Sequence, residues 1–188
     1  MYMNSNISEK KSNENIMSNV YQKALSFVYP EFQKSLESIH CKRKSLSTVP
    51  CLSTGSTRIK PIECDQTINS LLDIMNSTEK VTTLLKNIDG QTALLLGSRN
   101  YNLLLKMYIA KEKTTRLIRV TKMLRMMSSI DSPERTKACL QAHCEYLSFY
   151  NELEEIEKEM ELLLDALMFG LAKNKNAPDA LAIRIVLA

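Results

Sequence analysis

Apolar residues recur at the spacing of an α-helix through most of the chain. Three segments carry this pattern clearly, at about residues 65–88, 91–127 and 132–173. A weaker pattern covers residues 14–40, where Pro30 predicts either a kinked helix or two short ones, because proline lacks the N–H that a helix interior needs. The pattern as a whole predicts an all-α fold.

Residues typical of helix ends mark the boundaries of these segments. Asp65 is a good N-cap for the first, and Gly90 is typical of a helix end. Gly97 falls inside the second segment and is expected to weaken it by about 1 kcal/mol. Ser132 followed by Pro133 predicts the start of the third, because serine caps a helix and proline fits its first position. The same dipeptide is also a minimal site for a proline-directed kinase.

Three stretches lack a clear helical period. Residues 1–13 are polar and are predicted to be disordered, and residues 41–64, which are rich in Ser and Thr, are predicted to form a flexible linker. The basic triplet 42–44 in this linker is either a solvated surface feature or a kinase or nuclear-targeting signal. Residues 174–188 end in an apolar run that either docks on a partner or folds back onto its own bundle.

The third helical segment carries a heptad repeat, the pattern typical of a coiled coil. The a and d positions of this seam are Cys139, Ala142, Tyr146, Phe149, Leu153, Ile156, Met160, Leu163, Leu167 and Gly170. The larger residues of the seam are the predicted contacts with a partner protein: Phe149, Leu153, Ile156, Met160, Leu163 and Leu167.

Runs of three leucines also indicate that these helices pack against more than one neighbouring helix. They occur at residues 94–96, 103–105 and 162–164. Three consecutive helical residues sweep about 200° of the helix circumference, which is more than one neighbouring helix covers. Residues 65–88 supply one further neighbour within the chain. We expect the remaining apolar surface to need a partner protein, with contacts that include Leu103, Leu104 and Leu105.

Charge divides sharply between the second and third segments. The second carries eight basic residues against one glutamate, whereas the middle of the third carries seven glutamates against one lysine. A short turn between them predicts an antiparallel hairpin in which Arg116 lies near Glu145 and Lys106 near Glu155. Exposed pairs of this kind fix register more than they add stability.

The basic residues also allow a second hypothesis, a surface that binds an acidic polymer such as a microtubule or a nucleic acid. The candidate residues are Lys113, Arg116, Arg119, Lys122 and Arg125. The net charge is only +4, and the acidic helix offers these residues partners within the chain. Both facts favour pairing within the chain and do not favour nucleic acid.

Composition narrows the function classes further. The five cysteines show no regular framework, which indicates reduced thiols inside a cell, and no run of residues is long and apolar enough to span a bilayer. The chain has two histidines and no glycine-rich phosphate loop, so nothing points to an enzyme or a cofactor. His143 with Cys139 and Cys144 lacks a fourth ligand for zinc. We therefore expect no catalytic, cofactor-binding or metal site.

Residues 65–173, with a basic and then an acidic helix and the seam ELEEIEKEMELLLDALM, resemble small coiled-coil subunits of augmin, of the insect type. The Ser/Thr-rich stretch SLSTVPCLSTGST ahead of them is part of the likeness. The resemblance implies a subunit of a hetero-oligomer that recruits γ-tubulin ring complexes to existing spindle microtubules in mitosis. It also implies that the protein is intracellular and localises to the cytoskeleton of the spindle. Small subunits of kinetochores and of vesicle-biogenesis scaffolds share the same pattern.

The sequence as a whole predicts an elongated antiparallel helical hairpin or bundle with coiled-coil segments and a disordered N-terminal linker. Its expected role is that of a non-catalytic structural subunit whose partners are other coiled-coil proteins.

Overall fold

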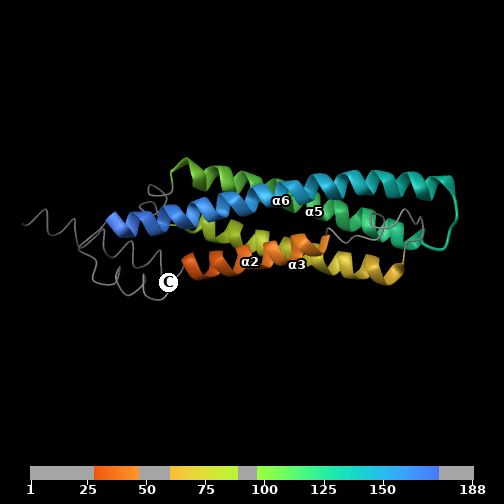
Figure 1. Ribbon diagram of the computed structural model, residues 1–188, viewed down its shortest axis with the longest axis horizontal. Coiled ribbons are helices and arrows are strands. Elements are labelled where there is room, and N and C mark those ends of the chain that lie inside the picture. Colours follow the sequence, from red (N-terminus) through yellow and green to blue (C-terminus); the bar gives the residue numbers. More distant parts are fainter. Residues whose placement is uncertain (1–27, 47–59, 89–96, 174–188) are drawn as a thin grey trace, which may run out of the picture.

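The computed structural model describes residues 28–46, 60–88 and 97–173, with side chains of the last range described as far as Ala166. These residues form four helices and no strand, which confirms the all-α prediction (Figure 1). The helices are α2 (Tyr29–Leu46), α3 (Pro61–Lys86), α5 (Ser98–Met126) and α6 (Pro133–Lys173).

The four helices form an elongated antiparallel bundle. Each helix packs along the next one in the chain, and α6 closes the ring by packing on α2 (Figure 1). Polar contacts between helices fix the antiparallel register. Lys106 bonds to Glu159 while Arg116 bonds to Glu145, so residue numbers rise along α5 as they fall along α6.

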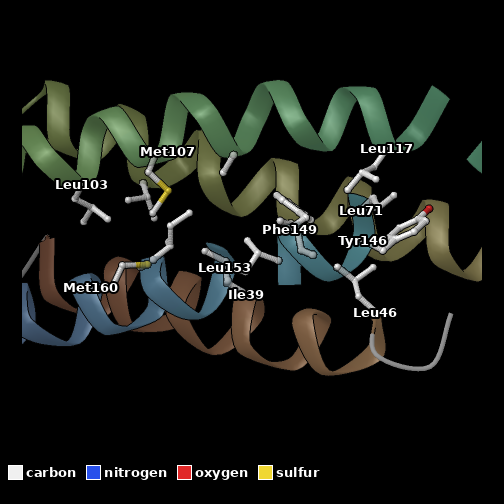
Figure 2. Close-up of a cluster of buried hydrophobic side chains, with 14 of the residues drawn as sticks. Ile39, Leu46, Leu71, Leu103, Met107, Leu117, Tyr146, Phe149, Leu153 and Met160 are labelled. Carbon is white, nitrogen blue, oxygen red and sulfur yellow. The ribbon is translucent and has the colours of Figure 1, made fainter. Parts of the chain in front are cut away.

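The core follows a heptad pattern in both long helices. The buried residues of α5 alternate at spacings of four and three: Leu103, Met107, Ala110, Thr114, Leu117, Thr121 and Leu124. Those of α6 do the same and lie in the predicted seam: Ala142, Tyr146, Phe149, Leu153, Ile156, Met160 and Leu163. Figure 2 shows these two rows facing each other, with Ile39 and Leu46 of α2 and Leu71 of α3 completing the core. This period is the one that lets antiparallel helices stay in contact over many turns.

Two threonines in the α5 row show how a polar residue fits this core. Thr114 and Thr121 are almost fully buried, and each donates its hydroxyl to the carbonyl oxygen four residues earlier, at 2.7 and 2.6 Å. Thr121 also bonds to the Tyr146 hydroxyl of α6. Their hydroxyl groups are therefore satisfied, which removes most of the cost of burying them.

The start of α6 is confirmed and the start of α5 differs from the prediction. Pro133 is the first residue of α6, and the backbone N–H of Arg135 donates to Ser132 Oγ at 3.2 Å, so serine caps this helix. Gly97 does not lie inside α5. It precedes the helix, with φ at 56°, a conformation that glycine adopts without strain.

Both ends of the segment predicted as a flexible linker, residues 41–64, are helical, and residues 47–59 within it lie outside the described set. Helix α2 continues to Leu46, and α3 already begins at Pro61, so Asp65 is an interior residue and not an N-cap. Proline is tolerated in the first turn of a helix, which explains the start of α3 at Pro61. Pro30 is the second residue of α2 and follows a π-helical turn at Val28.

Several predictions fall outside the described residues. They concern the disorder of residues 1–13, the helix expected at residues 14–27, the cap at Gly90, the leucines at 94–96 and the docking of residues 174–188. The side chains of Leu167 and Gly170 also lie outside the described set.

Candidate interaction surface

The predicted partner-binding seam of α6 is the core of the chain itself. Phe149, Leu153, Ile156, Met160 and Leu163 are each 0–2% exposed. On α5, Leu103 is also fully buried. The sequence pattern predicts three helices around this seam, whereas the structure adds α2 as a fourth. In this conformation these side chains lie in the shared core of a bundle in which α6 packs on α2 and α5, and they offer no surface to a partner protein.

The leucine runs at 103–105 and 162–164 are only partly covered. Leu104 and Leu164 pack on the core, whereas Leu105 and Leu162 are about half exposed, at 50% and 47%. One leucine of each of these two runs therefore remains exposed, as expected for three consecutive leucines on a helix.

The basic residues of α5 are largely used within the bundle. Lys113 bonds to Glu152, Arg116 to Glu145 at 2.8 Å, and Arg125 to Asp65 of α3 at 2.8 Å. The two ion pairs predicted from the sequence, Arg116–Glu145 and Lys106–Glu155, are both present, the second with its charged atoms 3.7 Å apart.

Only two of the five candidates for an acidic polymer are left without an acidic partner. Arg119 and Lys122 are exposed and bond to no carboxylate among the residues that the structure describes. A continuous basic stripe is therefore not available on α5, because three of its cations are held by acidic side chains of neighbouring helices.

An apolar patch lies on the outward side of α5 near its start. We call it the outer patch, and it consists of Tyr101, Leu105, Tyr108 and Ile109 of α5 with Leu162 of α6. The α5 members follow each other at spacings that place them on one side of the helix. Arg99 donates to the carbonyl oxygen of Leu162 at 3.2 Å, which brings this residue beside the first turn of α5. The ammonium group of Lys86 lies 4.9 Å from the centre of the Tyr108 ring and borders the patch.

A buried ion pair joins the first and last described helices. Arg43 of α2 donates from Nε and from its terminal nitrogen to the two carboxylate oxygens of Glu157 on α6, at 2.5 and 3.0 Å. His40 Nδ1 lies 2.9 Å from the same carboxylate, and the guanidinium stands 4.7 Å from the centre of the Tyr150 ring. The hydrogen bond with Glu157 raises the pKa of Arg43, so the group stays charged.

The basic triplet 42–44 is therefore neither a solvated linker nor an exposed signal. It lies in the last turns of α2, where Arg43 is buried and Lys42 bonds to Asp73 of α3 at 2.7 Å. One sequence signal could have found this. Arg43 follows the buried Ile39 by four residues and precedes the buried Leu46 by three, which places it on the inward side of α2.

The described residues hold no cluster suited to binding a metal ion. No group of three His, Cys, Asp or Glu side chains within them could hold a metal ion. Cys144 is exposed and lines an open pocket of about 270 Å³ between α5 and α6, together with Lys113, Arg116 and Phe149 among others. None of the helices within the described ranges combines the length and apolarity needed to cross a bilayer.

The buried thiol of Cys64 gives a pH-dependent prediction. Burial, followed by the nearby charges of Asp65 and Glu63, raises the pKa of Cys64 to about 11. At pH 8 its thiolate fraction should be about two to three orders of magnitude below that of an ordinary thiol of pKa about 8.5. Iodoacetamide should therefore alkylate Cys41 and Cys144, which are exposed, at least about a hundredfold faster.

Mass spectrometry of the alkylated peptides over time measures this ratio. The rate at Cys64 should continue to rise with pH up to about 11. Equal rates at all three thiols would contradict the buried position of Cys64.

Comparison of the chain with family models, with curated proteins and with solved structures found no match. The likeness to small augmin subunits thus rests on the sequence features alone and stays a prediction.

Proposed function

We propose that this chain is a non-catalytic structural subunit of a multi-protein helical assembly. The observation that carries the proposal is the outer patch, whose four α5 residues lie on one side of the helix at 43–69% exposure, with the half-exposed Leu162 of α6 beside the first turn of α5. Contiguous exposed apolar surface on a soluble domain is typical of a contact with another protein.

The partner that fits this surface is an amphipathic helix of another subunit. Along α5, the apolar residues from Tyr101 to Ile109 are followed on the exposed surface by Arg119 and Lys122. A helix lying along α5 over this span would be about 30 Å long. It would place an apolar stripe on the outer patch and acidic side chains beside Arg119 and Lys122.

In its specific form the proposal is an augmin-like subunit that supports recruitment of γ-tubulin to spindle microtubules. The support for this form is the resemblance of residues 65–173, with the basic helix followed by the acidic one. A subunit of a kinetochore or of another scaffold complex is the alternative. Capture from dividing cells with mass spectrometry separates them, because only the augmin-like form predicts γ-tubulin complexes among the captured proteins.

Two surface substitutions test the role of the outer patch. Leu105→Asp with Ile109→Asp should weaken capture of the partner subunits on the order of a hundredfold, because two apolar contacts are lost and two carboxylates are left in the interface. The side chains are half exposed, so the helix content in circular dichroism should stay that of the unchanged chain. Quantitative mass spectrometry of the captured proteins provides the measurement.

A matched control uses the same chemistry elsewhere on the bundle. Leu140→Asp with Leu147→Asp removes two leucines of α6 that are 64% and 53% exposed. This variant should capture the same partners as the unchanged chain. If it loses them while the Leu105→Asp/Ile109→Asp variant keeps them, the outer patch is not the contact surface.

A further inference from the structure

Ser132 lies at the end of the bundle where the chain turns from α5 into α6 (Figure 1). In this turn Asp131, Pro133 and Glu134 are exposed, and Ser132 is half-buried. Its Oγ accepts a hydrogen bond from the Arg135 backbone N–H at 3.2 Å. The oxygen therefore sits at the N-terminus of a 41-residue helix, where free N–H groups and the helix dipole favour negative charge.

The side chain of Arg135 provides a second, independent observation. It is only 6% exposed, and among the described residues the one carboxylate it contacts belongs to Asp131, at 2.8 Å, whose own side chain is 95% exposed. The Nε atom of Arg135 is buried and has no hydrogen-bond partner among the described residues. An unused donor on a buried guanidinium is unfavourable, and an added anionic acceptor at this helix end would relieve it.

We propose that Ser132 is a phosphorylation site for a proline-directed kinase and that Arg135 and the first N–H groups of α6 receive the phosphate. Ser132 Oγ attacks the γ-phosphorus of ATP, forming one P–O bond while the bond from that phosphorus to the β–γ bridging oxygen breaks. ADP leaves, and the hydroxyl proton passes to the catalytic carboxylate of the kinase. The site goes beyond the proposed function, because it adds regulation at the opposite end of α5 from the outer patch.

The surrounding charges decide whether the phosphate stabilises or disrupts this end of the bundle. A phosphoserine carries about −1.5 to −2 charges near pH 7. The nearby carboxylates of Asp131 and Glu134 are exposed, so water and salt screen their repulsion. The contact with Arg135 is buried and is screened much less, and Lys137 adds an exposed cation in the same part of α6. The phosphate therefore stabilises the start of α6.

The test uses the full chain in two forms. In the first, the folded chain is treated with ATP and a proline-directed kinase, and mass spectrometry should find phosphate on Ser132. Ser129 is the internal control, since it is exposed in the same turn but is not followed by proline. In the second form, phosphoserine is encoded at position 132 during synthesis. It should raise the Tm by about 2–4 °C, and its phosphate should titrate in ³¹P NMR below its ordinary value of about 6.

Variants of Arg135 separate its role from that of the helix dipole. In Arg135→Met the rise in Tm and the lowered titration midpoint should both be largely lost. Arg135→Lys, which keeps the charge and removes Nε, should show a reduced effect and serves if the first variant does not fold. Absence of phosphate on Ser132 in the folded chain, a Tm lowered by the phosphoserine, or equal effects in the Arg135 variants would overturn the proposal.

Discussion

A chain that carries Ile156→Asp together with Leu163→Asp should not fold. Both residues lie in the core, at 2% and 0% exposure, and each substitution would place a carboxylate among apolar side chains from the neighbouring helices. Burying an unpaired charge costs several kcal/mol, and a domain of this size has about 5–15 kcal/mol of stability in total. Circular dichroism at 222 nm should show most of the helix signal lost at 25 °C, and gel filtration should show an expanded or aggregated chain.

The control for this variant is again Leu140→Asp with Leu147→Asp. It places the same two carboxylates on the same helix at exposed positions, and its free energy of unfolding should change by only about 1 kcal/mol in total. A different outcome for the core variant would be informative. If it kept its full helix signal and lost only its partners, the seam would be a surface between proteins, and the bundle would have to open for assembly.

Removing the carboxylate of Glu157 should be the next most damaging change. Glu157→Gln removes the buried carboxylate that pairs with Arg43 and leaves only the partly exposed Glu154 carboxylate, 3.9 Å away, as a counter-charge, which should cost about 3–5 kcal/mol of unfolding free energy. Because the pKa of Arg43 is raised in the folded state, the stabilisation that its charge contributes is fully present at pH 7 and is lost only at strongly alkaline pH. Urea unfolding at pH 7, followed by circular dichroism, therefore measures it in full.

Two further variants distinguish the effect of an unpaired buried charge from the effect of losing any ion pair. Arg43→Met combined with Glu157→Met removes both charges and should recover most of the loss, because apolar pairs often replace buried ion pairs without cost. Arg116→Gln breaks an exposed pair with Glu145 and should cost about 1 kcal/mol or less. If Glu157→Gln cost no more than Arg116→Gln, the close packing of α2 on α6 at this point would be incorrect.

The period of the apolar residues and the sign of the charges were enough to predict the α5–α6 hairpin. Both are local properties of the sequence, so the seam of α6, the cap at Ser132 and the pair Arg116–Glu145 could be read without knowing the rest of the fold. The exposure of Leu105 is also a local property, since three consecutive leucines on a helix cannot all face the core.

Residues 41–46 of α2 read as part of a linker because polar side chains mark part of the contact between α2 and α3. Ser38 bonds to Ser77 at 2.9 Å and Ser45 to Ser70 at 3.0 Å, so hydroxyl pairs accompany the apolar core residues of α2. Ser45 is the one Ser or Thr of the predicted linker that lies within the described residues, and it belongs to this interface. Without α2 in place, the seam of α6 looked exposed, and its residues were assigned to a partner protein.

The pairing of Arg43 with Glu157 also sets the order of events during synthesis. The two residues are 114 positions apart, so at about 5–20 residues per second a ribosome adds Glu157 roughly 6–23 s after Arg43. Throughout that interval α2 has no α6 to close against, and its arginine remains hydrated. A nascent chain halted before α6 emerges would therefore hold an open three-helix intermediate, which is the form in which chaperones would meet it.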